Sequence, residues 1–119
     1  MNSDLDEVFE RLARSSFHRR FRLRPAERAY LERKGLDAVM SHGEEFIEQR
    51  LAPADPPNDG KQTPMRNHPI FVAQHGTATC CRGCLGKWHS ILKGHALTSE
   101  EKVYVLSILR RWLIAQGGA

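Results

Sequence analysis

The sequence lacks any long hydrophobic run and contains few cysteines. No window approaches the roughly 18 consecutive apolar residues that a membrane-spanning helix needs. The first 16 residues are acidic and amphipathic, without a basic stretch leading into an apolar one, so we expect no signal peptide and a cytoplasmic location. The three cysteines are an odd number, which argues against a disulfide framework and favours thiolate ligation or redox chemistry.

The familiar motifs of zinc enzymes are also missing. The chain contains neither H-E-x-x-H nor H-x-E paired with P-C-x-x-C. Between Pro57 and Leu97 the only acidic residue is Asp59. A hydrolytic zinc site needs a carboxylate to move the proton of the bound water, so this scarcity of acid favours binding over catalysis.

The net charge of +4 is unevenly distributed along the chain. Residues 1–50 hold ten basic and ten acidic residues, whereas residues 51–119 hold eight and four. Six arginines and no acid fall between Arg11 and Arg24. Such stretches are often plain solvated surface, but they can also contact phosphates. The candidate residues for a nucleic acid or another polyanion are Arg19, Arg20, Arg22, Arg24, Lys61 and Arg66.

Hydrophobic periodicity predicts a mainly α-helical protein. An apolar stripe predicts a first helix from Ser3, and Pro25 and Gly35 bracket a second helix with the sequence PAERAYLERK. Another stripe predicts a third helix over residues 36–51. Thr98 and Glu101 form a capping-box pattern that opens a last helix.

At most one short strand is expected, at IFVAQ (residues 70–74). The 119 residues suffice for one core, so we expect a single domain over residues 1–119. Residues 52–69 contain five prolines and cannot form a regular element. We expect this proline-rich loop to pack on the domain, whose irregular middle segment a metal would hold together.

All three cysteines lie in the stretch HGTATCCRGCLGKWH at residues 75–89. Cys81 and Cys84 form a C-x2-C pair, and His89 follows at zinc-knuckle spacing. Zinc in proteins is held by about four nitrogen or sulfur ligands in a tetrahedron. The fourth ligand is open on spacing alone: the candidates are His75, Cys80, His95 and His68.

The block NDGKQTPMRNHPIFVAQHGTATCCRGCLGKWH, with EKVYVLSILRRWL after it, resembles a family of short bacterial proteins classed as a domain of unknown function. The similarity covers nearly the whole chain and is densest from Asn58 to His89. It implies a self-contained small domain in which the loop and the Cys/His cluster occur together, and it implies no activity. His95 lies outside the matching pattern, which favours His75 as the fourth ligand.

The sequence therefore predicts a small module that binds Zn²⁺ through His75, Cys81, Cys84 and His89, with a structural ion and a polyanionic partner. Two alternatives from other classes are kept. One is a metal-dependent hydrolase or nuclease with an open zinc site. The other is a thiol redox switch without a metal.

Overall fold

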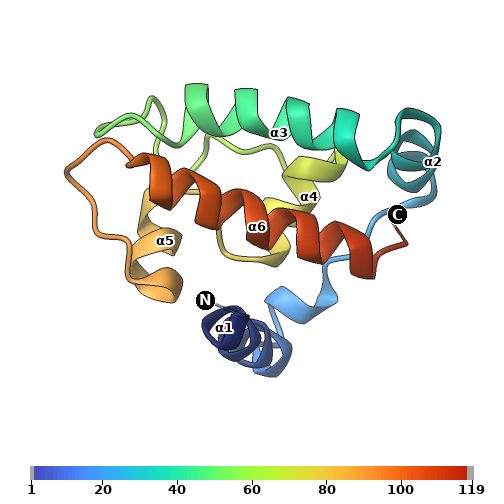
Figure 1. The fold of residues 1–119 in the computed structure, drawn as a ribbon, viewed down its shortest axis with the longest axis horizontal. Helices are drawn as coiled ribbons and strands as arrows, with labels where there is room; N and C mark the ends of the chain where they lie inside the picture. Colours follow the sequence, from blue (N-terminus) through green and yellow to red (C-terminus); the bar gives the residue numbers. More distant parts are fainter. Residues whose placement is uncertain (1, 118–119) are drawn as a thin grey trace.

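Two long antiparallel helices frame the structure, a computed structural model that describes residues 2–117. They are α3 (Leu36–Arg50) and α6 (Ser99–Ala115), which run side by side in opposite directions (Figure 1). The short helix α4 (Pro69–Gly76) packs against both. Near the two ends of this frame lie α2 (Pro25–Lys34) and α5 (Arg82–His89) (Figure 1). The remaining elements are α1 (Asn2–Arg14) and the 3₁₀ helix η1 (His18–Arg20).

The prediction of a mainly helical protein is confirmed, and residues 2–117 contain no strand. Helix α2 has the predicted bounds, with Pro25 in its first turn. The capping box of α6 is also present. The amide of Glu101 donates to the Thr98 hydroxyl at 3.1 Å, and the amide of Thr98 donates to the Glu101 carboxylate at 2.9 Å.

The prediction of a strand at IFVAQ is wrong, because these residues belong to α4. The side chain of His68 caps this helix by accepting a hydrogen bond from the amide of Ile70, and Pro69 occupies its first turn. Every residue of α4 except His75 is buried. A helix buried on all sides has no polar face, so its apolar run looks like a buried strand.

Glycines allow α4 to approach its neighbours closely. A Cβ atom on Gly43, in the middle of α3, would lie 2.8 Å from Cδ1 of Ile70. A Cβ atom on Gly76 would lie 3.0 Å from Nε1 of Trp112 in α6. Both distances are shorter than ordinary van der Waals contact. Glycine is unfavourable in the middle of a helix, but Gly43 leaves space for α4 to pack against α3.

The proline-rich loop lies against the rest of the fold. Pro56 and Thr63 are buried, and the carbonyl of Ala52 accepts a hydrogen bond from the amide of Leu97 at 2.8 Å. A second, smaller apolar cluster holds α1 in place: Val8 and Leu12 pack with Ala78, Cys84 and Trp88. The cysteine segment is therefore enclosed between the loop on one side and α1 on the other.

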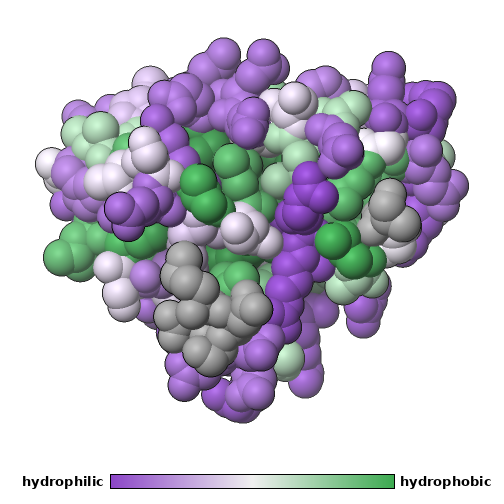
Figure 2. Space-filling model, viewed as in Figure 1, coloured by the Kyte–Doolittle hydropathy of each residue, from purple (hydrophilic) through white to green (hydrophobic). Residues whose placement is uncertain are grey.

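The outer surface mixes polar and apolar residues. Figure 2 shows hydrophobic patches among hydrophilic ones over the face along which α6 runs. Helix α6 carries two exposed large apolar side chains, Val103 and Ile114. Among residues 2–117, no helix combines the length and the apolar character needed to cross a membrane.

Candidate metal centre

The buried turn at residues 77–79 precedes Cys80 and Cys81, which are partly exposed. Thr77, Ala78 and Thr79 are fully buried between α4 and α5. The hydroxyl of Thr77 donates to the carbonyl of Ala73 at 2.7 Å, and the side chain of Gln74 donates to the carbonyl of Thr79 at 3.0 Å. Ala78 adopts a left-handed backbone conformation with φ of 59°. These contacts fix the backbone from which Cys80 and Cys81 project.

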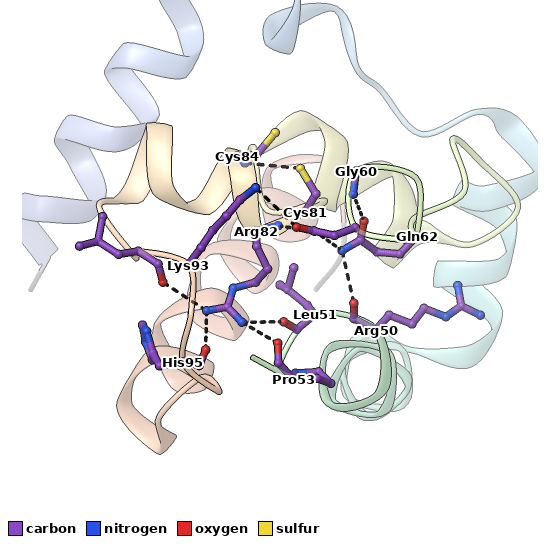
Figure 3. A network of polar contacts seen from close by, with 12 residues as sticks. Arg50, Leu51, Pro53, Gly60, Gln62, Cys81, Arg82, Cys84, Lys93 and His95 are labelled. Carbon is purple, nitrogen blue, oxygen red and sulfur yellow. Dashed lines mark hydrogen bonds and ion pairs between the residues drawn. The ribbon is translucent and has the colours of Figure 1, made fainter. Parts of the chain in front are cut away.

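Helix α5 supplies the third cysteine. Cys81 is the N-cap residue of α5, and its sulfur accepts a hydrogen bond from the amide of Cys84 at 3.4 Å (Figure 3). Cys84 follows one turn into the helix and faces back toward the turn. The carboxylate of Asp59, from the proline-rich loop, accepts a hydrogen bond from the amide of Arg82 at 3.0 Å. The start of α5 is therefore held by a thiol and a carboxylate together.

The three sulfurs form a compact group, which we call the cysteine triad (Cys80, Cys81 and Cys84). All three Sγ atoms lie within 4.8 Å of one another, and Cys80 and Cys84 are 3.6 Å apart. Sulfurs bound to one tetrahedral zinc at 2.3 Å would stand about 3.8 Å apart. All three side chains are partly exposed. The triad therefore fits a metal ion in both spacing and access.

The three thiols differ in acidity. The hydrogen bond from the Cys80 thiol is the main cause that lowers the pKa of Cys84 to about 6, and His75 and Lys87 lower it further. The same hydrogen bond, followed by burial, raises the pKa of Cys80. Burial raises the pKa of Cys81. At neutral pH, Cys84 is therefore the thiolate of the triad and Cys80 donates to it.

His75 is near enough to the triad to act electrostatically on Cys84, although its ring nitrogens lie outside the group of three sulfurs. It is the last-turn residue of α4, and its Nε2 donates to the carbonyl of Thr63 at 3.0 Å. Its ring stacks on Phe21, with centroids 5.8 Å apart. The hydroxyl of Thr63 in turn donates to the carbonyl of Cys80 at 2.8 Å. His75 is thus oriented by the loop, with Nδ1 free of its proton in the neutral ring.

The other predicted histidine ligand, His89, also lies outside the group of three sulfurs. Its Nε2 donates to the carbonyl of Thr77 at 2.8 Å, and its Nδ1 accepts from the hydroxyl of Tyr104 at 2.9 Å. Burial is the main cause that lowers the pKa of His89, which keeps the ring neutral. Among the side chains of residues 5–117, only the three cysteines form a group of potential ligands with this spacing.

The two remaining candidate histidines lie in other parts of the fold. His68 caps α4, and its Nε2 donates to Nδ1 of His42 at 3.2 Å. The Nε2 atom of His95 is 2.9 Å from the carboxylate of Glu101 at the start of α6. Both therefore have local partners that account for their positions.

Arg82 has a role that its sequence context did not reveal. It belongs to the basic excess around the cysteines, yet its side chain is only 1% exposed. The guanidinium donates to four carbonyls from two segments, as Figure 3 shows. The carbonyls belong to Leu51, Pro53, Leu92 and His95, at 2.7 to 3.3 Å. Arg82 therefore fastens both flanking loops to α5 instead of contacting an external anion.

The predicted anion-binding arginines line hollows that are separate from the triad. Arg20, Arg22 and Arg24 line a hollow of about 460 Å³, and Arg66 from the proline-rich loop lines the same hollow. Arg19 lines a neighbouring hollow of about 200 Å³. Lys61 is exposed on the loop and lines neither hollow.

Comparison with known families identifies one that matches most of the chain. The family described as "Domain of unknown function (DUF4186)" matches residues 6–114. The chain belongs to this DUF4186 family. The match spans the triad, the proline-rich loop and both frame helices, so these features occur within one family domain. No solved structure matches the chain.

Proposed function

We propose that this DUF4186 protein is a small zinc-binding domain in which the cysteine triad holds a structural Zn²⁺. The observation that carries the proposal is the placement of three sulfurs within 4.8 Å of one another. Thiolate ligands favour soft or borderline ions such as zinc over magnesium or calcium. Such a site needs reduced cysteines, in keeping with a cytoplasmic location.

We assign the fourth ligand to Nδ1 of His75. A zinc-bound histidine usually donates its other ring N–H to a carbonyl or carboxylate. The hydrogen bond from Nε2 of His75 to Thr63 is of this type and leaves Nδ1 as the ligand atom. His89 is left out because both its nitrogens already bond within the fold. In this assignment Cys80 is a zinc ligand, and His89, which the sequence spacing predicted as one, is not.

The ion would connect parts of the fold that are weak alone. Helices α4 and α5 have eight residues each, which is too short for independent stability. A zinc bound by His75 and the triad would link the end of α4, the turn and the start of α5. Metal-binding free energy then becomes folding free energy, because no such site exists in the unfolded chain.

Elemental analysis of the purified protein, combined with thiol titration, tests this proposal. We expect about one zinc per chain. The three thiols should be protected from an aromatic disulfide reagent until a chelator is added. Three freely reacting thiols, together with failure to take up zinc or Co²⁺ after reduction, would show that the proposal is wrong.

A thiol redox switch is the second candidate, and the 3.6 Å separation of Cys80 and Cys84 favours it. The Cys84 thiolate would attack an oxidising disulfide such as glutathione disulfide, releasing one glutathione thiolate. Cys80 would then give up its proton to the released glutathione thiolate and attack the Cys84 sulfur of the mixed disulfide, forming the Cys80–Cys84 bond and releasing the second glutathione as a thiolate. This candidate expects no bound metal and a two-thiol loss on oxidation, so the same titration separates it from the zinc site.

The hydrolase alternative has less support. Asp59 is the carboxylate whose charge acts on Cys81. Its Oδ1 already accepts from the amide of Arg82 and the side chain of Gln62, and its Oδ2 lies 3.8 Å from Nζ of Lys93. A general base must be able to take up a proton. Burial raises the pKa of Asp59, but these hydrogen bonds and nearby cations outweigh it and leave the pKa lowered.

A further inference from the structure

A second site is formed by arginines that the metal centre does not use. The segment from η1 to α2 and the end of the proline-rich loop enclose the hollow of about 460 Å³. We call it the arginine groove, after Arg20, Arg22, Arg24 and Arg66. An adjoining hollow of about 280 Å³ shares Arg24, Glu27 and Arg66 with it. The smaller hollow lined by Arg19 shares Phe21 and Arg22 with it. The three hollows therefore adjoin one another.

The positive charge in this groove is not neutralised within the fold. All four arginines are exposed, and none pairs with a carboxylate among the side chains of residues 5–117. Other arginines do have partners: Arg110 pairs with Asp37 and Arg111 with Asp6. The one acid lining the groove, Glu27, is 5% exposed. Its carboxylate accepts the backbone amides of Arg24 and Asn67, so it is engaged internally.

The backbone between η1 and α2 places Arg22 and Arg24 on one side of the chain. The flanking residues Phe21 and Arg24 have extended dihedral angles. In an extended chain, residues two apart lie on one side, about 6.6 Å from each other. Leu23, between the arginines, is buried. Arg22 and Arg24 therefore point away from the core, and Arg20 lies beside them in the groove.

Apolar and aromatic side chains line the arginine groove and the hollow of about 280 Å³ beside it. Met65 is 53% exposed and Phe21 is partly exposed. Tyr30 lines the adjoining hollow. A group of cations beside aromatic and apolar side chains suits a chain of phosphates with flat bases attached. A small anion could be bound by fewer cations than the four arginines of the groove, so their number favours a longer polyanion. A duplex is read by a protruding helix or ribbon, not by a concave cleft.

We propose that the arginine groove binds single-stranded nucleic acid. The guanidinium groups contact successive phosphates, and Phe21, Met65 and Tyr30 contact base faces. The proposal uses residues outside the metal centre. Metal content measured on the same preparations will therefore show whether one proposal fails without the other.

Fluorescence anisotropy tests this proposal with labelled oligo-dT and oligo-U of about 12 nucleotides. We expect binding of at least one of them to weaken between about 50 and 200 mM salt, with a log–log slope of about −3 for four phosphate contacts. The two oligonucleotides distinguish DNA from RNA. No binding to either, or tighter binding of a duplex of the same length, would overturn the proposal.

Substitutions locate the site. Arg22→Ala and Arg66→Ala should each weaken binding about fivefold and reduce the salt slope by about 1. Arg110→Ala removes the same charge from α6 and should change affinity less than twofold. Equal effects of all three substitutions would overturn the proposal. Ultraviolet crosslinking of the unmodified protein gives a second measurement. Crosslinks should fall on residues 17–30 or 61–72, and crosslinks only elsewhere would contradict the groove.

Discussion

Cys84 differs from the two cysteines beside it because its sulfur accepts hydrogen bonds that theirs donate. A thiolate is the form that binds metal, and it is stabilised here by neighbouring thiols and by the positive charge of Lys87. Metal binding would release the protons of Cys80 and Cys81 and replace these hydrogen bonds with metal–sulfur bonds. The acidity of one residue thus prepares the whole triad for an ion.

The fourth ligand can be tested with two histidine substitutions. His75→Ala should lower zinc affinity about 10–100-fold, because it removes a ligand and its orienting hydrogen bond. His89→Ala should keep one zinc per chain but destabilise the fold by about 1–3 kcal/mol, because the Thr77 carbonyl loses its donor. Competition with a chromogenic chelator measures the affinities, and urea unfolding measures the stabilities. If His89→Ala lost the metal and His75→Ala kept it, the assignment would be reversed.

His68 should make the protein sensitive to mild acid. Burial and the nearby His42 lower the pKa of His68 to about 4, below the roughly 6.5 of an unfolded histidine. Its stabilising effect is therefore complete above about pH 6.5 and is lost as the pH falls toward 4. Partial exposure of the ring reduces this effect to about 1–2 kcal/mol.

His68→Asn is the matched variant for this prediction. Asparagine can accept the amide of Ile70 as an N-cap and does not titrate. The difference in urea midpoint between the parent protein and this variant should shift in favour of the variant from pH 7.5 to pH 5. A difference that stays constant with pH would exclude His68 as the source. His18 and His89, whose pKa values are also lowered chiefly by burial, are present in both proteins.

At the scale of elements, Arg82 determines how α5 joins the rest of the fold. Arg82→Met should lower the free energy of unfolding by about 3 kcal/mol or more, because the four carbonyls lose a buried charged donor. Lys87→Met removes the same charge from an exposed position of α5 and should cost less than about 0.5 kcal/mol. Chemical unfolding of both variants provides the comparison. Similar stabilities for the two would show that the carbonyl contacts contribute little.

Helices with one apolar face could be predicted from the sequence, and those without one could not. The apolar stripes and end signals of α1, α2, α3 and α6 are local features, so their positions follow from neighbouring residues. Helix α4 is buried on all sides and was mistaken for a strand. Helix α5 contains Gly83 and Gly86 and depends on Asp59 and on the carbonyls around Arg82. Such distant contacts leave no periodic pattern.

In the candidate site, too, local features could be predicted from the sequence and distant contacts could not. The spacing of the cysteines is local and identified Cys81 and Cys84, whereas Cys80, which the structure brings together with them, was predicted only as an alternative ligand. The positions of His75 and His89 depend on how α4 and α5 fold back, so spacing alone could not separate them. Arg82 resembled the other basic residues because its burial is due to segments about 30 and about 10 residues away.

At the scale of the whole molecule, the metal centre and the arginine groove are neighbours in space. His75 connects them: its ring stacks on Phe21 of the groove, and its electrostatic effect reaches Cys84 of the triad. The loop that carries Arg66 also carries Thr63, which bonds both His75 and the backbone of Cys80. A bound ion would thus fix the wall of the groove as well as the turn.

Removal of the metal should therefore destabilise the entire fold cooperatively. Free zinc at about a thousand times its dissociation constant stabilises a folded protein by about 4 kcal/mol. For a domain of this size, chelation should then lower Tm by roughly 10–20 °C. Calorimetry of the zinc-loaded and chelated protein measures the shift. A variant with serine at Cys80, Cys81 and Cys84 is the control, and its Tm should not respond to chelator. Equal Tm values for loaded and chelated parent protein would mean that the ion, if bound, does not hold the fold together, because a ligand that binds only the folded state must raise its stability.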